Sequence, residues 1–334
     1  MSEIGSPEGV KLSVGEVLST TARAIGARIG PFVLVAALGA TPGSILMQIM
    51  SHFMQTKMVG IVDASSAGNP DAMMDVFSGM LVLYLGLMGA LVLHMLLSYA
   101  AQTVLIRGTL DWISGRKTDT SELIRRALPR VPSVLGVVFL RGLAQFGVMM
   151  PGMIVGMVMM VGVGGLAGLS SGGEHAGQGA AVGVLGMLCA MPVMLLLMLV
   201  PMVYLVILLF TAEATVVAET VGPIRAISRS ASMSRGNRLA IFLLILAAGS
   251  AFVVLTCGLG MFAGIANLAT GGMDAATGMA RAPSVFASVL GALINIVMYT
   301  VQALVFAPMA SVIYARLAGL SARVDAAEVA EVFA

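Results

Sequence analysis

The stretch ETVGPIRAISRSASMSRGNRLAIFLLILA, residues 219–247, decides the class of this protein, because it joins a short basic segment to a long apolar run. Pro223 suits the first turn of a helix, where a missing N–H leaves no bond unmade. Gly236 and Asn237 tolerate the backbone angles that end a helix. We therefore expect a short amphipathic helix, a break at this pair, and a second helix that enters a membrane just after Arg238.

The composition of the whole chain agrees with that expectation. The 334 residues are 59% hydrophobic and 10% charged, with a mean hydropathy of +1.02. Soluble domains are about 25% charged, so these values indicate a multi-pass membrane protein. Long apolar runs, rather than alternating segments, favour helices over a barrel of strands. The net charge of +2 is too small to suggest a nucleic-acid partner.

Six apolar runs are each long enough for the roughly 20 residues that a membrane-spanning helix requires. They predict an all-α bundle of six transmembrane helices at residues 32–54, 76–106, 134–166, 181–217, 239–268 and 285–314. The fourth run is too long for one straight span, so we expect either kinks at Pro192 and Pro201 or an end near Thr211. Short links rich in Gly, Ser and Ala are predicted at 55–75, 167–180 and 269–282.

Basic residues orient this array. Of the 18 Lys and Arg residues, all but Lys57, Arg281 and Arg141 fall on one side of the predicted bundle. By the positive-inside rule both termini are cytoplasmic, in a bacterial inner membrane. We divide the chain into a cytoplasmic N-terminal segment, a six-span membrane domain and a cytoplasmic tail, at residues 1–30, 31–317 and 318–334.

A basic amphipathic helix is predicted before the first, third and fifth spans. The first begins with a capping box of Ser13 and Glu16 and has Val17, Leu18 and Ile29 on one face. In the helix after Pro223, an apolar face includes Ile224. These three helices either lie in the membrane interface or pack on other parts of the protein.

The spans that return to the cytoplasmic side end alike, which indicates an internal repeat. Their ends read AAQTVLIR from Ala100, AEATVVAE from Ala212 and PMASVIYA from Pro308. Each predicted unit is an amphipathic helix, a span out and a span back. All three units enter the membrane in the same orientation, so the predicted repeat is parallel. Basic amphipathic links without any repetition would give part of the same pattern.

Three ionisable residues are predicted within the spans: His94, Arg141 and Glu213. Arg141 lies about 10 Å into the third span and Glu213 about 6 Å from the end of the fourth, at 1.5 Å per residue. The two spans are antiparallel neighbours, and each charge is costly alone in hydrocarbon. We therefore predict a contact between Arg141 and Glu213. For His94 we expect a hydrogen-bonded packing role.

Six arginines at the predicted interface are candidates for contact with anionic lipid headgroups: Arg125, Arg126, Arg225, Arg229, Arg235 and Arg238. Each basic residue near an anionic surface contributes about 1 kcal/mol. The same residues also serve to set topology, which requires no lipid site. Two G-x-x-x-G pairs, Gly152–Gly156 and Gly260–Gly264, have the spacing that allows close helix contact.

The motifs Gly222-Pro223-Ile224, Arg229-Ser230 and Arg235-Gly236-Asn237-Arg238 carry a resemblance. So do the N-terminal stretch 13–32 and the tail 323–334. In these places the chain resembles the membrane domain of membrane-anchored glycerophosphoryl diester phosphodiesterases. The resemblance implies a membrane domain without the catalytic domain, because the activity of that family lies in a separate soluble domain.

Catalytic residues of that family are not expected in this chain. Their set includes a His-Arg-Gly segment, whereas none of His52, His94 and His175 is followed by Arg. We predict no enzymatic activity, no catalytic residue, no metal site and no cofactor. The leading hypothesis is a non-enzymatic membrane module that contacts lipids or a partner membrane protein. The alternatives are a transporter or channel for a lipid-like or small amphipathic solute, and a subunit of a larger membrane complex.

Overall fold

The structure is a computed structural model that describes residues 11–66, 70–116, 118–170, 176–269 and 284–320. Within these ranges the regular elements are helices, and no strand occurs. Six helices are long and apolar enough to cross a membrane, as predicted. The elements are α1 (Val14–Ala27), α2 (Ile29–Ser66), α3 (Pro70–Ile113), α4 (Thr120–Ala127), η1 (Leu128–Arg130), α5 (Val131–Ser170), α6 (Ala176–Leu209), α7 (Ala212–Glu219), α8 (Pro223–Met233), α9 (Arg238–Ala269) and α10 (Val285–Leu317).

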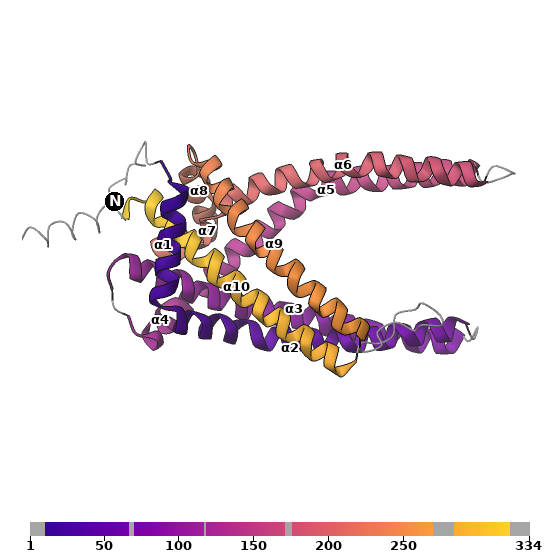
Figure 1. Ribbon diagram of the computed structural model, residues 1–334, viewed down its shortest axis with the longest axis horizontal. Coiled ribbons are helices and arrows are strands. Elements are labelled where there is room, and N and C mark those ends of the chain that lie inside the picture. Colours follow the sequence, from indigo (N-terminus) through magenta and orange to yellow (C-terminus); the bar gives the residue numbers. More distant parts are fainter. Residues whose placement is uncertain (1–10, 67–69, 117, 171–175, 270–283, 321–334) are drawn as a thin grey trace, which may run out of the picture.

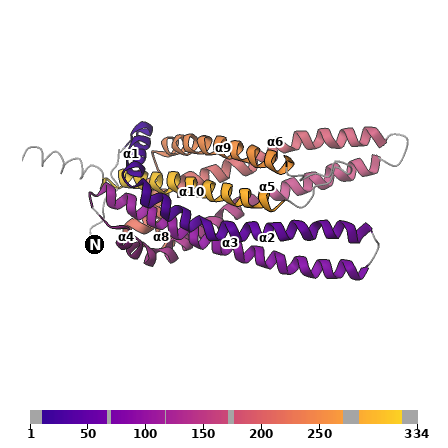
Figure 2. The ribbon, with the colours of Figure 1, turned by 60° about the horizontal axis from the view of Figure 1, so that its bottom comes forward.

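The short helices gather at one end of the molecule, and the long helices extend away from them. Figure 1 shows α1, α4, α7 and α8 together at this end, which we call the base; we call the opposite end the tip. The hairpins α2–α3 and α5–α6 diverge toward the tip in both views (Figures 1 and 2). Helix α10 packs along both α2 and α3.

The packed core lies at the base, where the three similar span ends come together. Thr103, Thr215 and Ser311 occupy corresponding positions in those ends, and all three are fully buried. Each hydroxyl donates to the carbonyl four residues earlier, at 2.7, 2.9 and 2.8 Å. These bonds leave no hydroxyl donor unpaired, which permits close packing. Toward the tip, by contrast, many large apolar side chains are exposed, as expected for a surface that faces lipid.

The predicted links were wrong in extent. Helix α2 continues to Ser66 and α3 begins at Pro70, so most of 55–75 is helical. Likewise α5 ends at Ser170 and α6 begins at Ala176. Gly, Ser and Ala lower the hydropathy of a run without by themselves ending a helix. The third predicted link, 269–282, lies almost entirely outside the described residues.

The helix of the fourth span breaks close to Thr211, the residue near which one of the two predictions placed the end of the span. Helix α6 runs through Pro192 and Pro201 to Leu209, and α7 begins at Ala212. The break frees backbone carbonyls at the end of α6. Ser230 of α8 supplies a donor for one of them: its hydroxyl donates to the Leu208 carbonyl at 2.8 Å and lies 2.9 Å from Thr211 Oγ1. The basic segment after Pro223 therefore closes the break in the span before it.

The turn between α8 and α9 has the predicted form. Pro223 is the first residue of α8, with Gly222 as its N-cap. Gly236 has φ +87°, a left-handed angle that favours glycine, and α9 begins at Arg238. The Asn237 side chain accepts a hydrogen bond from the backbone N–H of Leu12 at 2.9 Å. This turn therefore also holds the segment that precedes α1.

The capping box at the start of α1 was wrong. Ser13 is the N-cap residue, but its side chain makes no capping bond. Glu16 instead accepts a hydrogen bond from Arg316 of α10 at 2.7 Å. The buried face of α1 consists of Val17, Thr21 and Ala24, and the helix packs on α9 and α10. Of the predicted apolar stripe, Leu18 and Ile29 are exposed instead.

Helix α8 also buries a different face from the one the apolar pattern indicated. Ala226 and Ser230 are its buried residues, whereas Ile224 is 76% exposed. The small side chains allow α8 to approach the end of α6 closely, and Ser230 can then reach the Leu208 carbonyl. Both α1 and α8 therefore contact protein on one face and leave a large apolar side chain exposed on another, Leu18 and Ile224 respectively.

Candidate functional site

A polar cavity of about 200 Å³ lies where α3, α5, α6, α7, α9 and α10 meet near the base. Its walls combine two kinds of side chain. The polar lining consists of Tyr99, Gln102, Arg141, Glu213 and Gln302. The apolar lining consists of Val206, Phe210, Ile245, Phe306, Ala307 and Ala310. The hairpins α2–α3 and α5–α6 and the last two long helices, α9 and α10, all contribute to this one cavity.

An ion pair forms the centre of the polar lining. Arg141 Nη1 of α5 lies 3.2 Å from Glu213 Oε1 of α7, which confirms the predicted contact. The two side chains are 29% and 13% exposed, respectively. Such a pair is worth little on its own, but loss of either partner leaves the other charge without compensation in an apolar environment. The pair also joins the α5–α6 hairpin to the base.

The break between α6 and α7 places Glu213 in this cavity. Phe210 and Thr211 interrupt the helix, and Glu213 lies in the first turn of α7. A second carboxylate at the end of α7 has different partners: Glu219 accepts from Tyr314 Oη at 3.1 Å and from Arg229 Nε at 3.4 Å. Helix α7 is thus fixed at its start to α5 and at its end to α8 and α10.

His94 does not line this cavity. It lies in α3 and is 4% exposed, and its ring centroid lies 4.3 Å from that of Tyr299 of α10. The predicted packing role is confirmed, but the predicted hydrogen bond was wrong: neither ring nitrogen has a hydrogen-bond partner within the described part of the chain. Gly43 of α2 lies directly against His94, which excludes a larger polar neighbour from that side.

The six candidate arginines divide into two groups. Three contact protein groups: Arg126 pairs with Glu122, Arg229 with Glu219, and the Arg238 guanidinium lies 5.3 Å from the centre of the Tyr204 ring. The other three side chains are exposed at the base, on α4, on α8 and in the turn before α9: Arg125, Arg225 and Arg235. The exposed group is the better placed for contact with an external anion.

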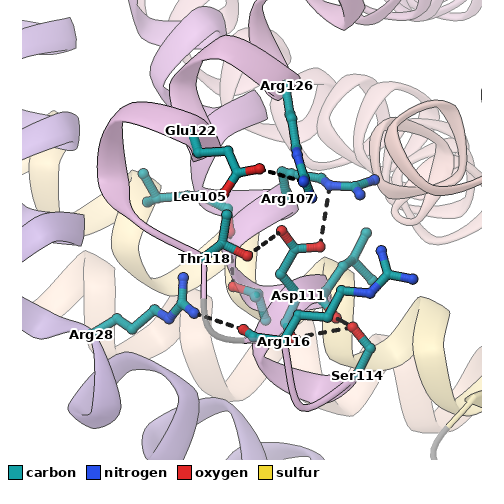
Figure 3. Close-up of polar contacts among 11 residues, drawn as sticks. Arg28, Leu105, Arg107, Asp111, Ser114, Arg116, Thr118, Glu122 and Arg126 are labelled. Carbon is teal, nitrogen blue, oxygen red and sulfur yellow. Dashed lines mark hydrogen bonds and ion pairs between the residues drawn. The ribbon is translucent and has the colours of Figure 1, made fainter.

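A separate cluster of polar side chains lies at the base, at the end of α3 and in the turn that leads to α4. Figure 3 shows Asp111, which is 2% exposed, between Arg107 Nε at 3.3 Å and the Thr118 hydroxyl at 3.1 Å. Arg28 donates to the Arg116 carbonyl at 3.1 Å (Figure 3). These bonds fix the turn between α3 and α4 against the start of α2. The cluster pairs its own charges, so its chemistry is structural.

A shallow hollow of about 350 Å³ borders this cluster, between the start of α2 and the start of α4. Its lining includes Arg28, Phe32 and Asp119. A hydrogen bond from the Ser121 hydroxyl at 2.7 Å, with backbone N–H groups of Thr120 and Ser121, lowers the pKa of Asp119. The hollow has one cation and one stabilised anion on its rim and no enclosed polar interior, so it is a weaker candidate than the Arg141 cavity.

Sequence reasoning missed three of the cavity residues, Tyr99, Gln102 and Gln302. The two glutamines could have been singled out, because a glutamine within an apolar span is costly in hydrocarbon and therefore indicates a polar contact or a functional role. The sequence does not show which spans meet, so it does not show that the two glutamines lie in one cavity with Arg141. No metal site is formed by His, Cys, Asp or Glu clusters within the described residues.

Comparisons with protein-family models, with curated proteins and with solved structures give no match. The resemblance to the membrane domain of glycerophosphoryl diester phosphodiesterases therefore remains a prediction from the motifs around Pro223.

Proposed function

We propose that this multi-pass membrane protein is a non-enzymatic module that binds lipid, with the headgroup held in the cavity at Arg141 and Glu213. The observation that carries this proposal is the ion pair itself. It is partly accessible, lies at the meeting point of the spans and borders an open volume of about 200 Å³. A pair that served only to connect two helices would need no open volume beside it.

The cavity suits an amphipathic molecule. The Arg141 guanidinium offers the planar donors that bind phosphate oxygens well, and Glu213 offers an acceptor for an ammonium group. Gln102 and Gln302 supply further donors and acceptors. The apolar wall, with Phe210 and Phe306, suits the glycerol and the start of the acyl chains. A zwitterionic phospholipid headgroup fits this arrangement of one cation and one anion.

The exposed arginines at the base support a second contact with lipid. Arg125, Arg225 and Arg235 extend from three different elements at the same end of the molecule. We propose that the base lies on the anionic cytoplasmic face of a bacterial inner membrane, with both termini cytoplasmic. A periplasmic phosphatase fused at Ala334 is expected to be inactive, and activity there would exclude this orientation.

The repeat and the family resemblance belong to the same proposal. Thr103, Thr215 and Ser311 share burial and hydrogen-bond pattern at corresponding positions, which supports three parallel units. The Ser230 bond gives a physical reason for the Arg229-Ser230 motif on which the resemblance rests. We propose a relationship to that family's membrane domain without its catalytic domain.

Native mass spectrometry after purification in mild detergent tests the lipid-binding proposal. The wild-type protein is expected to retain phospholipid. The double variant Arg141→Met, Glu213→Gln removes both charges without leaving either one unpaired, and is expected to lose that lipid while the protein stays folded. The matched control is Arg225→Gln with Arg235→Gln, two exposed arginines at the base, and it is expected to reduce only loosely held anionic lipid.

Two results would contradict the proposal. One is the same retained lipid in the wild type and in the Arg141→Met, Glu213→Gln variant, because the cavity would then not hold it. The other is a wild-type protein that carries a stoichiometric protein partner and no lipid, which would favour a subunit of a larger complex.

A further inference from the structure

Helix α10 carries polar side chains on one face, and that face begins in the cavity. Gln302 lines the cavity; Tyr299, Asn295 and Ser288 precede it by 3, 7 and 14 positions, a spacing that keeps all four on one side of a helix. Tyr299 is 37% exposed, and Asn295 is exposed as well. A polar face on a span that is otherwise apolar requires an explanation, because exposed amides are unfavourable in hydrocarbon.

Helix α2 completes this face where α10 lacks a polar residue. The longest interval lies between Asn295 and Ser288, and Gly291 falls within it. The side-chain amide of Gln48 occupies the space beside Gly291: a Cβ atom there would lie 3.2 Å from Gln48 Nε2. Beyond it, His52 Nδ1 lies 3.1 Å from Ser288 Oγ. Gln48 and His52 are one helical turn apart, so both face α10.

Together these side chains form a continuous strip, which we call the α10 polar track: Gln302, Tyr299, Asn295, Gln48, His52 and Ser288. At 1.5 Å per residue, the track rises about 21 Å along α10, with steps of at most about 6 Å. The hydrocarbon core of a bilayer is about 30 Å thick. The track and the cavity together therefore extend across most of the core.

Apart from the His52–Ser288 contact, the track differs from the polar contacts that join helices. Such contacts are buried between two helices, where each side chain finds a partner. Here every member of the track is partly or largely accessible. Ser44 of α2 and His94 of α3 are polar residues that are buried and do not belong to the track, although the His94 ring packs against Tyr299. Accessibility from end to end is what a passing polar group requires.

We propose that the α10 polar track conducts phospholipid headgroups between the two leaflets, while the acyl chains remain in the surrounding lipid. This inference rests on the proposed lipid binding at Arg141 and Glu213 and extends it from holding a lipid to moving one. The headgroup leaves the ion pair, passes Gln302, Tyr299 and Asn295, and reaches the Ser288–His52 pair near the start of α10. The movement is downhill and needs no nucleotide.

The test is lipid exchange between leaflets in vesicles. The purified protein is reconstituted in phosphatidylcholine vesicles that carry a fluorescent phosphatidylcholine, and dithionite is added outside. Wild-type protein is expected to expose the inner-leaflet probe to bleaching, so that the signal falls well below that of protein-free vesicles. Loss of only the outer-leaflet signal in wild-type vesicles would overturn the proposal.

The variant Asn295→Leu interrupts the track near its middle. We expect exchange to slow by about tenfold, the effect of about 1.4 kcal/mol of added barrier. The matched control is Val297→Leu, which changes an exposed residue two positions further along, on the opposite side of the helix. Equal exchange rates in Asn295→Leu and Val297→Leu would contradict the track.

A thiol-labelling experiment gives an independent readout. In a background with Cys189→Ser and Cys257→Ser, the variant Asn295→Cys is expected to react with a membrane-impermeant thiol reagent, and Val297→Cys is not. An unreactive Asn295→Cys protein that is folded and retains lipid would overturn the track and leave lipid binding intact. Absence of retained lipid in the wild type would instead overturn the proposed function.

Discussion

The hairpins α2–α3 and α5–α6 have similar lengths and apolar compositions, but their helices are held together in different ways. In α2–α3, Gly39 and Gly43 bring α2 onto the backbone of its partner. A Cβ atom at Gly43 would lie 2.5 Å from His94 Cα, and one at Gly39 would lie 2.9 Å from the Leu97 carbonyl oxygen. In α5–α6, the corresponding neighbours of Gly152 and Gly156 are methionine side chains.

The two hairpins also differ in how many other helices pack along their length. Helix α10 packs along α2 and α3, whereas the α5–α6 hairpin diverges from them toward the tip (Figure 1). Outside the hairpin, α5 and α6 contact the base helices α7 and α8, and the Arg141–Glu213 pair lies in this region. Backbone contact fixes the distance between two helices, while methionine adapts to change. The difference indicates one fixed hairpin and one that is held mainly at its base.

The strongest test of this difference is Gly43→Ala. The added methyl group collides with the backbone of α3, and overpacking of this kind costs about 1–3 kcal/mol. The Gly156→Ala variant adds the same group against the Met194 side chain, which can move. We expect Gly156→Ala to change the stability by less than about 1 kcal/mol, because alanine also favours a helix over glycine. Thermal unfolding in detergent measures both.

The control for these two variants is Gly89→Ala in α3. A Cβ atom there has no neighbour within 4 Å, so alanine is expected to be neutral or stabilising. Equal losses of stability in Gly43→Ala and Gly156→Ala would remove the distinction between the hairpins.

A second test concerns the attachment of the α5–α6 hairpin to the base. The Arg141→Ala variant leaves Glu213 without a cation, and we expect a loss of about 1–3 kcal/mol, below the range for fully buried pairs because Arg141 is 29% exposed. Addition of Glu213→Gln is expected to recover part of that loss. Simple additivity of the two changes in thermal stability would show that the pair is not coupled.

The smallest effect is expected at the break that carries α7. The Ser230→Ala variant removes the donor to the Leu208 carbonyl, and a hydrogen bond of this kind contributes about 1 kcal/mol. Ser228→Ala, on the exposed side of the same helix, is the control and is expected to leave the unfolding midpoint unchanged. If Ser228→Ala and Ser230→Ala behaved alike, the motif would need another explanation.

The glycines show how much of this fold the sequence predicts. The G-x-x-x-G spacing identified Gly152–Gly156, which does lie against α6. It also identified Gly260–Gly264, where a Cβ atom would have no neighbour within 4 Å. Gly39–Gly43 has the same spacing and makes the tightest contact, but it was not among the predicted pairs. Spacing shows that one face of a helix is smooth, whereas close contact also depends on the partner helix, which one segment does not specify.

In the candidate site, too, some contacts could be predicted from single segments and others depend on how the helices pack together. The Arg141–Glu213 contact was predictable, because two spans joined by a short link must be antiparallel and the rise per residue gives the depth of each charge. The contribution of Gln302 was not, because the position of α10 relative to α5 depends on the packing of all six spans. The α10 polar track was missed for a related reason: Gln48 supplies a group opposite Gly291, and only the packed pair of helices makes the strip continuous.

The contact between α1 and α10 can form only after nearly the whole protein has been synthesised. Glu16 and Arg316 are 300 residues apart in the chain, and the buried face of α1 packs on the last two spans. At about 5–20 residues per second, the ribosome reaches Arg316 roughly 15–60 s after Glu16. During that interval Val17 lacks the residues of α9 and α10 that form its cluster in the folded protein, so the packing of α1 is incomplete until the last span has been made. The fold closes only when the final span arrives.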